Sequence, residues 1–80
     1  MNKLHRAARD RVRPDRPHFL IGAQGMTYAI VPNTARAAKH LATNEFLDTQ
    51  TDRGVLYVEH RSIARICMEL RASGFRLGVL

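Results

Sequence analysis

Residues 55–80 read VLYVEHRSIARICMELRASGFRLGVL and predict a strand, a helix and a second strand in that order. The first four residues form an apolar run typical of a buried strand. Apolar residues then recur at i, i+3, i+4 and i+7, the spacing of one helical face. That face comprises Ile63, Ile66, Cys67 and Leu70. Ser62 is the candidate cap, and Gly74 follows the helix. Residues 75–80 alternate as an edge strand, with Phe75, Leu77 and Val79 on its inner face.

The preceding segment predicts two more strands and one more helix. Residues 19–21 and 26–31 form an expected hairpin around a loop at 22–25, and the second strand is apolar on both sides, as in a central strand. Asn33 or Thr34 caps a helix that runs from Ala35 toward Phe46 or Leu47. Its expected inner face is Ala37 or Ala38, Leu41, Ala42 and Phe46. The polar run 48–54 is expected to be a loop.

These elements predict an α/β fold with a small sheet of three to four strands and two helices. The expected order is strand, strand, helix, strand, helix, strand, with the three later strands parallel and the first antiparallel. Crossovers in one direction place both helices on one face, which leaves the other face as an oligomer or partner surface. A reversal of strand order places one helix on each face instead. The expected domains are a basic arm over residues 1–17, flexible and mostly disordered alone, and a single small α/β domain over 18–80.

The small size of the chain bears on its stability. A domain of 80 residues buries about 60 to 65% of the surface of its unfolded chain and is stable by only a few kcal/mol. A partner or a second copy is therefore expected to contribute.

Positive charge is concentrated at the amino terminus. Six of the thirteen Lys and Arg residues fall in the first seventeen positions: Lys3, Arg6, Arg9, Arg11, Arg13 and Arg16. Only Asp10 and Asp15 oppose them, so this arm carries +4 of the formal net charge of +6. Five of the six are Arg, whose planar fork binds phosphate in a bidentate manner. The arm is predicted to contact nucleic-acid phosphates, and the alternative is a solvated tail that keeps the protein soluble.

A second basic set lies on the last predicted helix. Arg61 and Arg65 are one turn apart on its outer side, with Arg71 further along. We expect Arg61 and Arg65 to contact a phosphate or an acidic protein surface. The alternative is an ordinary solvated helical face.

The sequence lacks a catalytic, metal or cofactor signature, and none of these is expected. The four histidines have no zinc-ligand spacing, and the loop 22–25 precedes a strand rather than joining a strand to a helix, as a nucleotide-binding loop would. Glu59 and His60 follow a predicted strand at its carboxyl end and form the one acid and base pair considered. The aromatic residues fall at core positions, which disfavours an exposed stacking platform for bases.

The resulting prediction is a non-enzymatic binding protein. Its arm contacts nucleic acid, and its domain associates with itself, as a possible homodimer, or docks on a protein. The alternative is a small inhibitor or adaptor that uses the arginines of its last helix and an open sheet edge to bind an acidic surface of a larger protein or nucleoprotein assembly and block it. A third interpretation is an enzyme that uses Glu59 and His60. A membrane partner is not expected, since no run of eighteen apolar residues is present. A single cysteine, Cys67, and the absence of a secretory signal fit a cytoplasmic location, while Asp10 and Asp15 disfavour a mitochondrial presequence.

Overall fold

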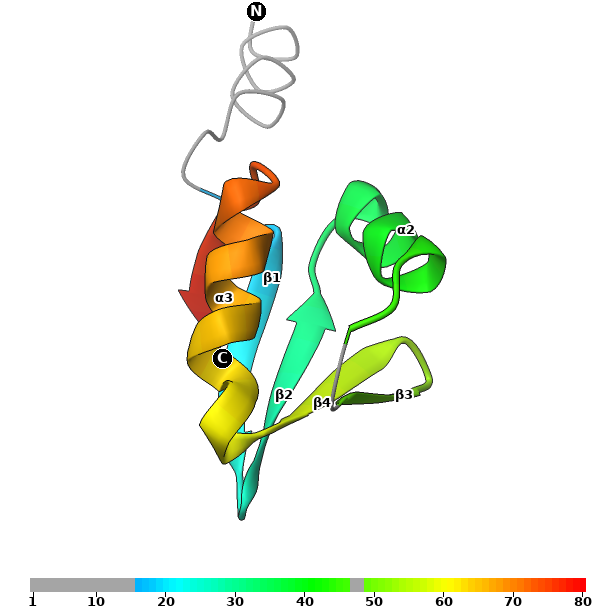
Figure 1. Cartoon of the computed structure of the whole chain (residues 1–80). Helices are drawn as coiled ribbons and strands as arrows, with labels where there is room; N and C mark the ends of the chain where they lie inside the picture. The colour runs from blue at the N-terminus through cyan, green and yellow to red at the C-terminus, as the bar shows by residue number, and fades with distance from the viewer. Residues whose placement is uncertain (1–15, 47–48) are drawn as a thin grey trace, which may run out of the picture.

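The computed structural model of the chain describes residues 16–46 and 49–80 and shows a mixed sheet with two helices (Figure 1). The basic residues of the arm at positions 3 to 13 lie outside the described residues. The elements in chain order are β1 (Phe19–Gln24), β2 (Thr27–Pro32), α2 (Ala35–Thr43), β3 (Thr49–Asp52), β4 (Val55–Glu59), the 3-10 turn η1 (His60–Ser62), α3 (Ile63–Ala72) and β5 (Leu77–Val79). The order across the sheet is β3-β4-β2-β1-β5.

The sheet has five strands, so the expectation of three to four was wrong. The additional strand is β3, which occupies most of the polar run 48–54 that was expected to be a loop. It forms a hairpin with β4, and the turn between them holds Arg53 at φ 53° and Gly54 at φ 81°. Positive φ at both central residues is the type I′ pattern that suits the twist of a tight hairpin. The strand was missed because it is polar and lies at an edge of the sheet.

The strand directions also differ from the expectation. In the sheet as described, β2 runs antiparallel to both β1 and β4, and only the pairing of β1 with β5 is parallel. The chain leaving α2 goes to the far edge of the sheet, forms β3, and returns through β4 beside β2. This hairpin reverses the strand direction that a simple crossover would have kept. The expected edge position of the last strand is confirmed, since β5 is at the end of the strand order.

Both helices begin near their expected positions. The Thr34 side-chain oxygen accepts a hydrogen bond from the Ala37 backbone N–H at 3.1 Å, so Thr34 caps α2. This helix ends at Thr43, before the expected end at 46 or 47, although Phe46 still packs against the core. Ser62 precedes α3 but makes no side-chain capping bond, because η1 leads directly into the helix.

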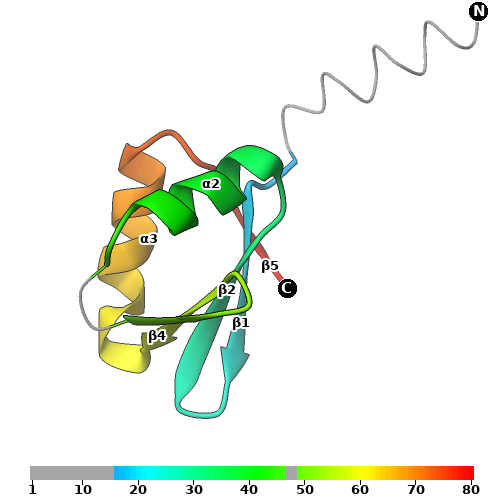
Figure 2. The same cartoon turned by 90° about the vertical axis from the view of Figure 1, so that its right-hand side faces the viewer.

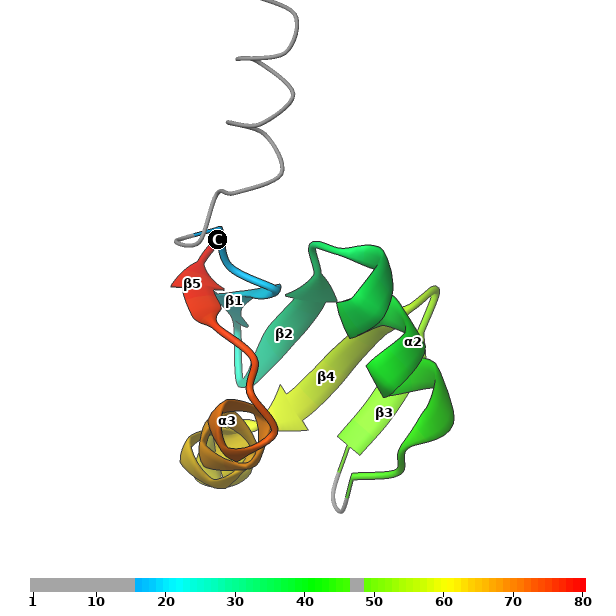
Figure 3. The same ribbon diagram turned by 90° about the horizontal axis from the view of Figure 1, so that it is seen from above.

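One hydrophobic core joins the two helices to the same face of the sheet. Its buried members are Phe19, Ile30, Ala37, Leu41, Leu56, Val58, Ile66, Leu70 and Phe75. Figures 2 and 3 show α2 and α3 on one side of the twisted sheet, with β1, β2, β3 and β4 enclosing the interior from the other side. This is the first of the two arrangements considered from the sequence, and it leaves the outer face of the sheet with neither of the two described helices over it.

The sequence predicts that Phe75 belongs to the last strand, and this prediction is wrong. It lies in the connection between α3 and β5, where it is only 5% exposed. Gly74, at φ 91°, turns the chain there, and the strand begins only at Leu77. Val79, expected on the inner face with Phe75, is 88% exposed because β5 is the last strand at its edge of the described sheet.

No helix within the described parts of the chain is long and apolar enough to cross a membrane.

Candidate anion-binding surface

Cationic and imidazole side chains surround Phe75 at the end of the sheet where β1 begins and β2 ends. They come from three separate segments: the residues around the start of β1, the outer face of α2, and the connection into β5. The members are Arg16, His18, Arg36, Lys39, His40 and Arg76. We call this set the Phe75 surface.

The Phe75 ring holds several of these groups in position. The Arg36 guanidinium carbon lies 4.5 Å from the centroid of the ring, which is a cation–π contact. The His40 ring centroid is 4.7 Å away and the His18 ring meets the phenyl ring edge-on at 5.3 Å. Phe19, in the core, meets it edge-on at 5.1 Å. The ring therefore connects the core to a layer of basic groups.

Hydrogen bonds connect the same surface to Arg16, the first described residue of the chain. The Arg76 backbone N–H donates to His18 Nδ1 at 2.9 Å, and Arg76 Nε donates to the Arg16 carbonyl at 3.1 Å. Arg16 Nη2 in turn donates to the Asn33 carbonyl at 3.1 Å, just before α2 begins. Arg16, the last basic residue of the arm, is thus anchored on the Phe75 surface.

A shallow hollow lies between α2 and the connection that follows α3. Its volume is about 260 Å³, and its lining residues are Arg36, Lys39, His40, Thr43, Ser73 and Phe75. No acidic residue of the described segments lines it. The four acidic residues in those segments are Glu45, Asp52, Glu59 and Glu69. The last two are ion-paired with arginines at a different place on the molecule.

The environment of His18 is consistent with a positive potential at this surface. Burial lowers the pKa of its imidazole below the usual value, and the nearby charges of Arg76 and Arg36 lower it further. Its Nδ1 also accepts the Arg76 backbone hydrogen bond, which requires that nitrogen to be unprotonated. His18 is therefore held in the neutral form.

The second basic set predicted from the sequence lies elsewhere and has acidic partners. Arg61 Nε is 3.0 Å from Glu59 Oε2, and Arg65 Nη1 is 2.8 Å from Glu69 Oε2. These residues belong to η1 and α3, beyond the carboxyl end of β4. The structure thus separates Arg61 and Arg65 from Arg16, and local carboxylates offset their charge.

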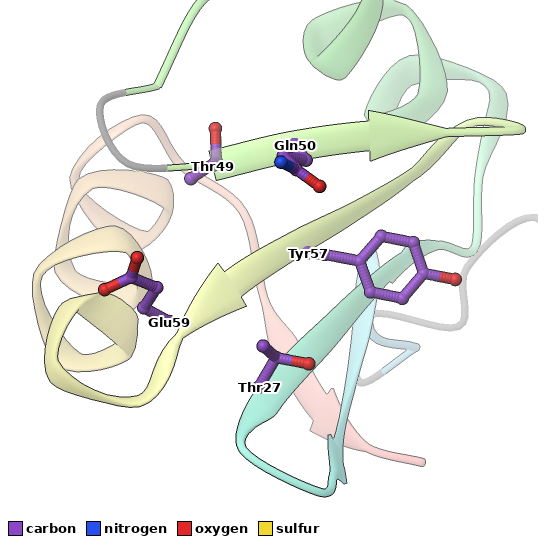
Figure 4. Close-up of a pocket in the computed structure, with 5 residues that line it drawn as sticks. All are labelled: Thr27, Thr49, Gln50, Tyr57 and Glu59. Carbon is purple, nitrogen blue, oxygen red and sulfur yellow. The ribbon is translucent and has the colours of Figure 1, made fainter.

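A second hollow, of about 360 Å³, is lined by Thr27, Thr49, Gln50, Tyr57 and Glu59 (Figure 4). Thr27 Oγ1 donates to the Gln24 carbonyl, and Thr49 Oγ1 donates to the Phe46 carbonyl. Figure 4 shows that the Tyr57 ring and the Glu59 carboxylate extend in opposite directions. The polar groups of this hollow therefore do not converge on one point, as an acid and base acting on one substrate must.

The acid and base considered from the sequence are engaged with different neighbours. Glu59 accepts a hydrogen bond from Arg61 Nε, while the His60 ring lies tilted beside the ring of Tyr28, with their centroids 5.8 Å apart. Within the described segments, no cluster of three or more His, Cys, Asp or Glu side chains could hold a metal ion. An enzymatic role for Glu59 and His60 stays a prediction.

The outer face of the sheet is only partly covered. A Cβ on Gly78 would lie 2.9 Å from Pro17 Cγ, and a Cβ on Gly22 would lie 3.0 Å from Leu80 Cβ, so Pro17 and Leu80 lie against this face beside β5 and β1. Leu20, Val31 and Tyr57 are half-buried in the strands nearby. Use of this face for self-association or protein docking stays a prediction.

The Phe75 surface was not predicted from the sequence, although the spacing of its residues on α2 could have indicated part of it. Arg36, Lys39, His40 and Thr43 fall at i, i+3, i+4 and i+7, which places them on one face of a helix. The contribution of Arg76 and His18 was not readable, because 58 positions separate the two residues that share the hydrogen bond.

Comparisons of the chain with protein-family models, with curated proteins and with solved structures find no match.

Proposed function

We propose that this chain is a non-enzymatic nucleic-acid-binding protein. The basic arm and the Phe75 surface together contact backbone phosphates, and the arm joins the domain at Arg16, within that surface. Arg61 and Arg65 are given a lesser role in this proposal than the sequence suggested, because each has a carboxylate partner.

The observation that carries the proposal is the unequal distribution of acid and base. Arginines at the η1 end of the molecule pair with glutamates, whereas Arg36 and Lys39 line a hollow to which the described segments contribute no acid. Like charges held close together are unfavourable without a counterion, and phosphate is the commonest polyanionic counterion for an Arg-rich surface. The arm joins the domain at Arg16, which belongs to the Phe75 surface.

Such contacts position a protein on nucleic acid without reading its sequence. The Phe75 ring is buried beneath Arg36 and the two imidazoles, so it offers no exposed face for a base. We therefore expect strong dependence on salt and weak dependence on base sequence.

The test is fluorescence anisotropy with a labelled 20-base-pair DNA duplex and a labelled single-stranded RNA, across a series of salt concentrations. Replacement of Arg6, Arg9, Arg11 and Arg13 by Gln is expected to reduce affinity and the slope of log K against log salt, by about 0.9 for each duplex phosphate that the variant no longer neutralises. Replacement of Arg16 and Arg76 by Gln is expected to act in the same direction.

The matched control is Arg61→Gln with Arg65→Gln, which removes as much charge as the Arg16 and Arg76 pair but from the η1 end. We expect this control to retain most of the affinity. Equal weakening in both pairs would show that net charge alone matters, and absence of salt-sensitive binding by the unaltered protein to either probe would refute the proposal. The adaptor alternative stays a prediction, which capture of a protein partner in place of nucleic acid would favour.

A further inference from the structure

We propose that the hollow between α2 and the connection into β5 seats a single backbone phosphate of the bound nucleic acid, through the Arg36 guanidinium and the Lys39 ammonium group. This inference rests on the proposed function and deepens it, because it names one site and the group that occupies it.

Arg36 is preorganised for this contact. Its guanidinium lies 4.5 Å from the centroid of the buried Phe75 ring, so the planar fork is held against a fixed support rather than moving freely in solvent. Gly74 lies beside it, since a Cβ at that position would be 3.7 Å from Arg36 Nη2. A fork held in this way loses less conformational freedom when it binds the two oxygens of a phosphate.

Lys39 and His40 lie three and four positions after Arg36 and line the same hollow. The Asn44 side-chain nitrogen is 3.3 Å from His40 Nδ1. The site thus places two cations, Arg36 and Lys39, beside the His40 imidazole.

The position of Arg36 on its helix also favours an anion. It is the second residue of α2, and no acidic residue occupies the first turn of that helix. A cation near a helix amino terminus is opposed by the helix dipole, and an anion bound beside it relieves this repulsion. The helix amino terminus is capped by Thr34, whose side-chain oxygen accepts from the Ala37 N–H, and the guanidinium of Arg36, which only donates hydrogen bonds, is left to face the hollow.

The experiment measures the salt dependence of binding of the full chain to the 20-base-pair duplex for Arg36→Gln, Lys39→Gln and the double variant. One shared phosphate predicts that the double variant lowers the slope of log K against log salt by about 0.9, the decrease expected for a single phosphate. Arg36→Lys retains the charge without the fork, and is expected to keep the slope while binding several-fold more weakly. Arg61→Gln with Arg65→Gln is the matched charge control and is expected to lower the slope by much less than about 0.9, because each arginine has a carboxylate partner.

Thermal unfolding of each variant shows whether the Phe75 region is intact. If Arg36→Gln disrupts it, Lys39→Gln still tests the site, because Lys39 is exposed and its truncation leaves no cavity. A decrease of about 0.9 in the slope of log K against log salt for the double variant supports a site for one phosphate. An unchanged slope, or a decrease that corresponds to two phosphates, overturns it. In both of these cases the arm can still bind, so the proposed function survives; it fails only if the unaltered protein shows no salt-sensitive binding.

Discussion

Phe75 shows how one side chain combines a structural and a surface role. Its ring packs on Phe19 in the core and supports Arg36, His18 and His40 on its other sides. Truncation of this ring would remove core packing and also release the groups that form the hollow. The residue is therefore a poor target for separating stability from binding, whereas the exposed residues around it are good ones.

At the same scale, His18 is expected to make stability depend on pH. Its folded-state pKa is below 6.5, so as pH falls past 6.5 the unfolded chain takes up a proton that the folded chain resists. The contribution of His18 to the free energy of unfolding is therefore fully present above pH 6.5 and is lost as the pH falls below that value. Urea unfolding at pH 7.5 and at pH 5.5 should show a smaller acid destabilisation in His18→Gln than in the unaltered protein.

The comparison with His18→Gln isolates the contribution of His18 from that of the other three histidines of the chain, His5, His40 and His60. An equal decrease of stability in both proteins on going to pH 5.5 would show that His18 does not carry this effect.

At the scale of elements, α2 presents two different faces. Ala37 and Leu41 are buried in the core, while Arg36, Lys39 and Thr43 line the hollow on the other side. The helix has only nine residues, so its stability depends on its cap and on its packing rather than on its own hydrogen bonds.

Thr34→Ala is expected to destabilise the protein by about 1 kcal/mol, because the Ala37 N–H loses its acceptor. Thr34→Ser keeps an oxygen at the same position and should cost much less. Denaturant unfolding of the two variants provides the measurement. Identical stability of Thr34→Ala and the unaltered protein would mean that the cap adds nothing to α2.

The β3-β4 hairpin depends on its turn. Gly54 has φ 81° with nothing within 4 Å of where a Cβ would be, so space is available but the conformation disfavours an L-residue. Gly54→Ala is expected to cost about 1 to 2 kcal/mol in the free energy of unfolding. Gly54→Asn, which tolerates positive φ better, should cost less. Denaturant unfolding measures both variants, and equal costs would contradict a conformational cause.

At the scale of the whole molecule, charge is separated in space as well as along the chain. The arm and the Phe75 surface meet at Arg16, and the arginines with carboxylate partners are at η1 and α3. A small domain with such an arrangement is expected to gain stability from a bound polyanion.

This expectation distinguishes binding by the folded domain from binding by the arm alone. An arm that binds equally well in folded and unfolded chains adds no folding stability, whereas a surface that exists only in the folded state does. Duplex DNA at 100 times its dissociation constant is expected to raise the free energy of unfolding by about 1 to 2.7 kcal/mol, measured by denaturant unfolding. The Arg36→Gln, Lys39→Gln double variant should show a smaller increase, and an unaltered protein without any increase would restrict binding to the arm.

Local patterns in the sequence were sufficient for several elements. Apolar spacing predicted α3, the capping residues Asn33 and Thr34 predicted the start of α2, and the apolar run at 55–58 predicted β4. The structure decides between the two caps in favour of Thr34. These predictions held because helix spacing and capping depend on residues only a few positions apart. The polar strand β3 had no such signal, and it exists because β4 supplies its hydrogen-bonding partner.

By itself, the sequence determined the α/β class, the buried face of α3 and the basic amino terminus. Of the inner face expected for α2, the structure buries Ala37 and Leu41 but leaves Ala38 and Ala42 exposed. Only the tertiary structure decided the strand directions, the position of Phe75 in the connection before β5, and which arginines have acidic partners. The physical reason is distance along the chain: the contacts of Arg76 with His18 and Arg16 join residues 58 and 60 positions apart. Only folding brings such groups together, and with them the hollow in which we place a phosphate.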